Sequence, residues 1–136
     1  MTSRGFTLVE LLVVLVILGL LAGLVGPQVV KHVGASKSRT AYLQIEELGM
    51  ALETYRLDMD VYPPAERGLA ALVQKPPGAE KWNGPYLRKP FVPKDPWGRE
   101  YRYRYPGKHG PFDLYSLGAD DADGGEGENA DVQNWK

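Results

Sequence analysis

Six carboxylates lie in the glycine-rich stretch from residue 117 to residue 135. Their mutual repulsion would prevent this stretch from folding alone, whereas Gly124, Gly125 and Gly127 permit tight turns that direct oxygens inward. Calcium accepts about six to eight oxygen ligands in irregular geometry, so the stretch indicates a calcium site. The spacing is not that of an EF-hand. A solvated acidic tail, or ion pairing to basic residues elsewhere in the chain, is the alternative.

A second candidate for chemistry is Glu10, at the start of an apolar N-terminal segment. The twenty residues from Leu11 to Val30 carry no charge, and a helix of that length spans roughly 30 Å, the thickness of the hydrocarbon core of a bilayer. A carboxylate there costs on the order of a few kcal/mol unless it is neutralised or paired. We expect its partner to be a positive charge from a neighbouring copy. An α-amino group released by cleavage before Phe6 would have the right sign and reach.

The apolar segment predicts a single membrane pass. Arg4 is the charged residue that precedes Glu10, so the positive-inside bias places the N-terminus in the cytoplasm and the chain beyond about Val30 outside. A secretory signal peptide has an apolar core of about 7–15 residues and a small-residue cleavage site. This segment is longer and lacks a clean site of that kind. A plain membrane anchor or a buried core helix are further interpretations, but neither an anchor nor a signal peptide accounts for Glu10.

A helix is predicted to continue from the membrane segment over residues 35–60. Gly34 and Ser36 leave open a bend near its start. Apolar side chains recur at steps of three and four residues and form one stripe, which consists of Ala41, Ile45, Leu48, Leu52, Tyr55 and Met59. Such a stripe must be covered, so we expect it to form the core of a small domain.

Residues 61–98 are predicted to be rich in loops, because prolines are frequent after Tyr62-Pro63-Pro64. A short helix is expected at about residues 66–73, and Asp95-Pro96-Trp97-Gly98 is typical of a turn. Residues 100–105 then alternate between tyrosines on one face and charged side chains on the other, which predicts a half-buried strand. Residues 112–117 are expected to pair with it. The small antiparallel sheet would cover the helix stripe.

Composition excludes several classes of function. The chain has 136 residues and a net charge of −1, which suits one small domain and gives no global electrostatic case for nucleic-acid binding. Residues 68–108 hold nine basic and three acidic residues, whereas residues 110–136 hold seven acidic residues and one basic. The absence of cysteine excludes disulfides, thiolate zinc sites and cysteine nucleophiles. His32 and His109 are too isolated for a catalytic or zinc site, so no enzymatic activity is predicted.

The strand at residues 100–105 could be taken for a nucleic-acid platform, because bases stack on aromatic rings and arginines bind phosphates. We expect instead that its tyrosines pack on the helix. Arg102 and Arg104 are expected to be solvated or to contact acids on a neighbouring copy.

The N-terminal sequence Arg4-Gly5-Phe6-Thr7-Leu8-Val9-Glu10, followed by the long apolar run, resembles the class III signal of type IV pilins and pseudopilins. The resemblance implies cleavage between Gly5 and Phe6 by a prepilin peptidase and N-methylation of Phe6. It also implies that Glu10 pairs with the terminal amine of an adjacent subunit during assembly.

The C-terminal sequence from Asp113 to Asp120, the Gly-Gly-Glu-Gly-Glu-Asn-Ala-Asp run and the closing Asn134-Trp135 are similar to the signature of the major pseudopilins of type II secretion systems. In that family this loop holds a calcium ion. The resemblance implies that the carbonyl of Leu117 and the side chains of Asp120 and Asp131 are ligands. Some relatives carry an acid where this chain has Ala130, so the shell would be completed by one of four further candidates: Asp123, Glu126, Glu128 and Asn129.

The resemblance implies an α+β, type IV pilin-like fold, in which a long N-terminal helix packs on a small antiparallel sheet with a calcium-stabilised C-terminal loop. The expected regions are a leader (1–5), a transmembrane and assembly helix (6–30) and a periplasmic domain (31–136). That domain comprises the helix 35–60, a loop-rich region (61–98), a sheet (99–117) and the acidic loop (118–136).

The implied function is that of a structural subunit, stored in the bacterial inner membrane as a single-pass protein, that polymerises into a periplasmic fibre and helps push folded proteins through an outer-membrane secretin. The implied partners are further copies of the chain, minor pseudopilins, the prepilin peptidase, and an inner-membrane platform protein with its ATPase. The alternatives are a type IV pilus subunit and a membrane-tethered calcium-binding module that does not polymerise.

Overall fold

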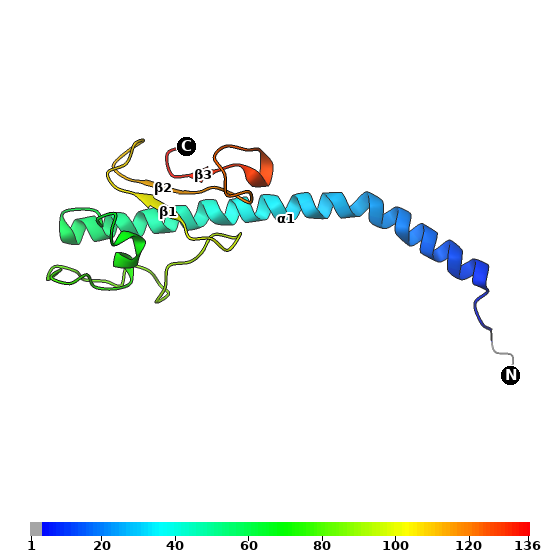
Figure 1. Cartoon of the computed structure of the whole chain (residues 1–136). Helices are drawn as coiled ribbons and strands as arrows, with labels where there is room; N and C mark the ends of the chain where they lie inside the picture. The colour runs from blue at the N-terminus through cyan, green and yellow to red at the C-terminus, as the bar shows by residue number, and fades with distance from the viewer. Residues whose placement is uncertain (1–3) are drawn as a thin grey trace. The chain divides into compact units, whose positions relative to one another are not determined.

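The computed structural model describes residues 4–136, so the first three residues of the predicted leader lie outside it. The elements in chain order are α1 (Leu8–Met59), η1 (Gly68–Leu72), β1 (Arg102–Arg104), β2 (Asp113–Ser116), η2 (Gly127–Asn129) and β3 (Val132–Gln133). The chain divides into two compact units, Met1–Gly34 and Ala35–Lys136. Figure 1 shows α1 and the strands along the chain.

The N-terminal unit holds the first part of α1, which has the length and apolar composition of a membrane-spanning helix. None of the side chains in its most apolar window is buried within the chain. Leu8, Leu20 and Leu24 are each more than two-thirds exposed. Exposed apolar surface of this extent is stable only when lipid or protein covers it.

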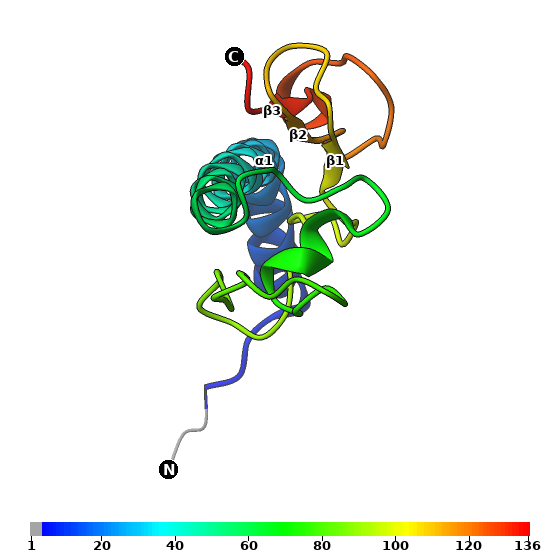
Figure 2. The same cartoon turned by 90° about the vertical axis from the view of Figure 1, so that its left-hand side faces the viewer.

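The C-terminal unit confirms the predicted stripe. Ala41, Ile45, Leu48, Leu52 and Tyr55 are buried, and Met59 packs partly buried against them. The stripe is covered by apolar side chains of η1, the strands and their flanks, which are Leu69, Ala71, Leu72, Tyr101, Phe112 and Leu114. Figure 2 shows the strands on one side of this part of α1 and the segment around η1 on another side.

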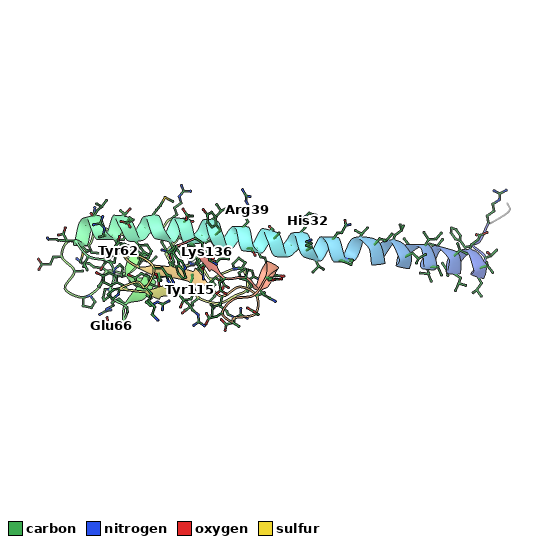
Figure 3. The ribbon with its side chains drawn as sticks, turned by 90° about the horizontal axis from the view of Figure 1, so that it is seen from above. His32, Arg39, Tyr62, Glu66, Tyr115 and Lys136 are labelled. Atoms are coloured by element: carbon green, nitrogen blue, oxygen red, sulfur yellow. The ribbon has the colours of Figure 1, made fainter. Side chains whose placement is uncertain are left out.

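The three strands form one antiparallel sheet in the order β1-β2-β3. The tyrosines in and beside β1 turn to the core as expected: Tyr101, just before the strand, is buried, and the Tyr103 hydroxyl donates to the Pro63 carbonyl at 2.7 Å. Figure 3 shows Tyr62 and Tyr115 on the side of α1 that the domain covers, whereas Arg39 projects from the other side. The long helix on a small antiparallel sheet confirms the predicted fold class.

Three details differ from the expectation. The short helix is a 3-10 helix confined to Gly68–Leu72, which begins two residues later than expected. The strands are shorter than the alternation suggested. A third strand, β3, lies inside the acidic loop and pairs with β2 through Tyr115 and Ser116. Two residues are too few for a periodic pattern to reveal a strand.

Candidate processing site and acidic loop

The peptide bond between Gly5 and Phe6 lies just outside α1. Residues 4–7 have no regular secondary structure and are exposed, with Phe6 85% accessible. Thr7 acts as the N-cap of α1, because its Oγ1 accepts a hydrogen bond from the Glu10 amide at 3.1 Å. The Leu11 amide bonds the Thr7 carbonyl at 3.1 Å. The predicted cleavage site is therefore an accessible segment ended sharply by a capped helix.

Glu10 stands in the first turn of α1 and is exposed. A carboxylate in this position interacts favourably with the positive end of the helix dipole. Thr7-Leu8-Val9-Glu10 also has the Ser/Thr-x-x-Glu spacing of a capping box, and the bond from the Glu10 amide to Thr7 supplies one half of it. No salt bridge engages the Glu10 carboxylate within the described chain (4–136). It is free to meet a cation from outside the chain.

The start of the acidic loop is crowded by carbonyl oxygens. Gly118 has a φ of +74°, and the position that a Cβ would take there lies 2.8–2.9 Å from the carbonyl oxygens of Glu128, Asn129 and Ala130. The Ala119 amide donates to the Glu128 carbonyl at 3.0 Å. Three successive carbonyls thus converge where the two arms of the loop meet.

The predicted carboxylate ligands lie at different places in the loop. Asp120 Oδ1 accepts from the Ala122 amide at 3.2 Å, and Asp131 Oδ2 accepts from the Gly124 amide at 3.1 Å. Asp123 and Asp131 line one cavity of about 250 Å³, which they share with Arg104 and His109. Among residues 4–136 no three acidic or histidine side chains gather closely enough to hold a metal ion. A cation in this loop would therefore depend on carbonyl oxygens as well as carboxylates.

The structure distinguishes among the remaining candidates. The Glu128 carboxylate accepts from Trp97 Nε1 at 2.9 Å and lies 4.0 Å from Lys37 Nζ, so it already has partners. Leu117 is buried beside β2, whereas Asn129 and Glu126 are exposed. Asp131 Oδ1 is buried and has no hydrogen-bond partner among the described residues. This oxygen and the convergent carbonyls are the features that fit calcium, which takes oxygen ligands.

The acidic loop also forms ion pairs with basic residues elsewhere in the chain, which was the predicted alternative to a calcium site. Asp121 is bound by two arginines: Arg102 Nη2 lies 3.3 Å from its Oδ1, and Arg99 Nε lies 3.7 Å from its Oδ2. Arg102 thus contacts an acid of its own chain, and so does Arg104, whose Nε lies 3.3 Å from Asp113 Oδ2. The Arg102 side chain is 52% exposed, as expected for a solvated face, whereas that of Arg104 is 33% exposed, and the pairing of both with acids of their own chain was not expected.

Asp113 is a buried acid that the sequence did not mark as special. Its side chain is fully buried and accepts from the amides of Lys108 (3.0 Å) and His109 (3.1 Å), with His109 Nδ1 3.2 Å away. Burial acts to raise the pKa of Asp113, but the Lys108 amide and the amide and ring of His109 outweigh it, so this pKa is lowered from its ordinary value. Asp113 therefore fixes the 106–110 loop as an ionised group.

Comparison with known proteins agrees with this arrangement. Residues 28–135 match the family model described as type II secretion system (T2SS), protein G, and residues 1–26 match the prokaryotic N-terminal methylation motif. The chain belongs to the type II secretion system protein G family. Its members are structural pseudopilins and not enzymes, so the expectation of no enzymatic activity is confirmed. The apolar helix and the methylation motif identify a membrane-anchored component of the secretion system.

Individual relatives in this family cover almost the whole chain. The type II secretion system core protein G of Pseudomonas aeruginosa is 50% identical over 98% of this chain and 95% of its own length. The protein of the same name from Vibrio cholerae is 46% identical over 98% of this chain and 92% of its own. The crystal structure of the major pseudopilin of enterohaemorrhagic Escherichia coli matches with a TM-score of 0.62 and 34% identity, over 74% of this chain and 87% of that one.

Sequence reasoning missed the residues that hold the acidic loop in place, above all Arg99, Trp97 and Asp95. The Asp-Pro-Trp-Gly pattern was visible, but it indicated only a turn. Its contacts with the loop span 19 to 31 residues of sequence, and no periodic pattern connects segments that far apart.

Proposed function

We propose that this pseudopilin polymerises through its N-terminal helix into a helical fibre in the periplasm, and that the fibre helps to drive folded proteins through an outer-membrane secretin. The observation that supports this most directly is the exposed apolar surface of the first part of α1. Lipid covers such a surface in a stored subunit, and neighbouring copies cover it in a fibre. A heterologous contact whose rotation does not close produces a filament.

Glu10 is the proposed switch between these two environments. Cleavage between Gly5 and Phe6 by a prepilin peptidase removes Arg4 and creates a new α-amino group on Phe6, which N-methylation retains as a cation. In the fibre this amine neutralises the Glu10 carboxylate of an adjacent copy. An unpaired Glu10 carboxylate raises the free energy of the helix in lipid, and the ion pair with the Phe6 amine of the adjacent copy removes this penalty.

The proposal places the subunit in the bacterial inner membrane with residues 31–136 in the periplasm. Its partners are further copies, minor pseudopilins, the prepilin peptidase, and the platform protein and ATPase of the secretion system. We further propose that the acidic loop binds calcium, with the Leu117 carbonyl, Asp120 and Asp131 as ligands and with Asp123, Glu128 and Asn129 as candidates for completing the shell. Asp131 Oδ1, buried and unpartnered among the described residues, supports this. The engagement of the Glu128 carboxylate with Trp97 makes its side chain the least available of these candidates.

The fibre proposal is tested with Glu10→Ala, with the exposed loop residue Glu80→Ala as control. Each variant is expressed with the secretion system, mature termini are determined by mass spectrometry, and fibres are counted by electron microscopy. We expect all proteins to begin at N-methylated Phe6. Glu80→Ala should form fibres, and Glu10→Ala should not.

Two results would contradict the proposal. A wild-type protein that keeps Met1 and stays monomeric in membranes would identify a simple tether. Fibres formed equally well by Glu10→Ala would show that the acid is not needed for assembly.

A further inference from the structure

The turn from Asp95 to Arg99 is fixed by its own hydrogen bonds. The Asp95 amide donates to the Arg99 carbonyl at 2.7 Å, and the Gly98 amide donates to the Asp95 carbonyl at 2.9 Å. Asp95 is 5% exposed, and its Oδ1 accepts from the amides of Trp97 (3.1 Å) and Arg99 (2.9 Å). The side chains of Trp97 and Arg99 therefore project from a rigid base.

Arg99 holds the start of the acidic loop. Its Nη1 donates to the Gly118 carbonyl at 2.9 Å and its Nη2 to the Ala119 carbonyl at 3.3 Å. The planar guanidinium thus fixes two successive peptide units, which the single ammonium of a lysine could not do with the same geometry. Arg99 Nε also faces Asp121 at 3.7 Å, so one side chain contacts three residues of the loop, Gly118, Ala119 and Asp121.

The same turn is linked to the loop at two further places, once through Ser116 at the end of β2 and once directly. Asp95 Oδ2 accepts from Ser116 Oγ at 2.7 Å, and Ser116 Oγ accepts from the Gly118 amide at 3.2 Å. At the other arm, Trp97 Nε1 donates to the Glu128 carboxylate at 2.9 Å. Since the Ala119 amide bonds the Glu128 carbonyl at 3.0 Å, both arms of the loop are tied to the turn and to each other.

We propose that the 95–99 turn is a clamp that keeps the acidic loop folded before any cation binds, with Arg99 as its principal positioning residue. Six carboxylates repel one another in this loop, and ordering a flexible segment costs conformational entropy. A clamp that forms during folding offsets both the repulsion and the loss of entropy before a cation arrives. The free energy of cation binding is then reduced less by the need to order the loop. The consequence for cation affinity rests on the calcium binding proposed above, whereas the clamp itself does not.

The test compares Arg99→Gln with Arg102→Gln in the full-length protein in detergent with a calcium chelator. Arg102 is a matched control, because it lies 3.3 Å from the same Asp121 carboxylate but bonds no loop carbonyl. Hydrogen exchange of the amides of residues 118–131 is measured by mass spectrometry. We expect Arg99→Gln to accelerate exchange about tenfold, the loss expected for charge-assisted hydrogen bonds. Arg102→Gln should change it less than about twofold, as for an exposed ion pair. Equal rates in the two variants would overturn the clamp.

Arg99→Lys separates geometry from charge. The clamp requires the planar fork, so this variant should exchange nearly as fast as Arg99→Gln. Wild-type protection in Arg99→Lys would show that charge alone holds the loop, and would overturn the proposal. Exchange of α1 amides from residue 41 to residue 55 reports whether the core is intact. If Arg99→Gln does not fold, Trp97→Phe keeps a ring but removes the bond to Glu128, and the amides of residues 126–129 should then exchange faster.

Calcium titration of the same proteins by calorimetry tests the consequence. Arg99→Gln should bind calcium about tenfold more weakly than Arg102→Gln, even though both lose one positive charge near the loop. Equal affinities would refute the effect on binding. If the wild-type protein shows no calcium binding, the calcium proposal fails, and the exchange comparison in chelator still decides the clamp.

Discussion

The Nδ1 atom of His109 lies 3.2 Å from Oδ2 of the buried Asp113, and the same imidazole stacks on the ring of Trp135. The two ring centroids are 4.1 Å apart and the planes differ by 3°. Asn134 adds two bonds to β2, through the Leu114 amide and the Leu114 carbonyl. The C-terminus is therefore held by the sheet on one side and, on the other, by a histidine that a buried acid orients.

Asp113→Asn should lower the free energy of unfolding by about 1.5–3 kcal/mol at neutral pH, because the amides of Lys108 and His109 then lose an ionised acceptor. The pKa of Asp113 is lowered in the folded state. Its contribution is therefore complete well above the ordinary value of 3.8 and is lost as the pH falls below it. Denaturant unfolding between about pH 3 and pH 7 measures this, and the variant should lose less stability on acidification than the wild type. An equally steep loss would contradict the assignment; Glu80→Gln is the control.

Gly118→Ala should destabilise the protein more than Gly124→Ala. Both glycines have positive φ, +74° and +81°, which costs an alanine about 1–2 kcal/mol. Only at Gly118 would the added Cβ approach three carbonyl oxygens within 2.9 Å, whereas nothing lies within 4 Å at Gly124. Thermal unfolding in chelator should show a lower midpoint for Gly118→Ala, and equal midpoints would mean that the carbonyls can move apart freely.

Leu52→Ala and Leu57→Ala compare two positions on one helix. Leu52 is fully buried against the sheet side of α1, whereas Leu57 is 72% exposed. Truncation at Leu52 should cost about 2–5 kcal/mol through lost burial and a cavity, and truncation at Leu57 less than about 0.5 kcal/mol. Urea unfolding of the two variants checks the ranking. A large cost at Leu57 in the monomer would contradict the burial pattern.

Calcium removal should lower the stability of the wild-type protein, if the acidic loop binds the ion as proposed. At a free calcium concentration of 100 times Kd the gain is about 2.7 kcal/mol. Asp131→Asn should abolish this gain. Asp121→Asn should retain the gain from calcium. Its stability without calcium should be lower than that of the wild type, because Asp121 pairs with Arg99 and Arg102. Melting curves with calcium and with chelator distinguish these outcomes, and a wild-type curve unmoved by calcium would contradict the site.

Periodic features were predictable from the sequence and non-local ones were not. The spacing from Ala41 to Tyr55 identified the buried face of α1, because burial on a helix repeats with its turn. The alternation in β1 identified the tyrosine face for the same kind of reason. The partner of Arg102, which is Asp121, depends on where the acidic loop returns to the sheet. That return is set by tertiary contacts such as the bond from Trp97 to Glu128, across 31 residues.

The candidate metal ligands show the same limit. Composition and resemblance located them in one loop, but the direction of each carboxylate depends on local turns. The Asp131 carboxylate is oriented by its bond to the Gly124 amide, and the Glu128 carboxylate by its bond to Trp97 Nε1. Neither orientation can be predicted from the spacing of residues in the sequence.

The hydroxyl of Thr7 places the first turn of α1 just beyond the bond that the peptidase is proposed to cut. Removal of residues 1–5 would therefore not shorten α1, whose first part enters the bilayer. Maturation would change only the chemistry at the start of the helix, because Arg4 is lost with the leader and the terminal amine is then carried by Phe6. The subunit would require no refolding before it joins the growing polymer.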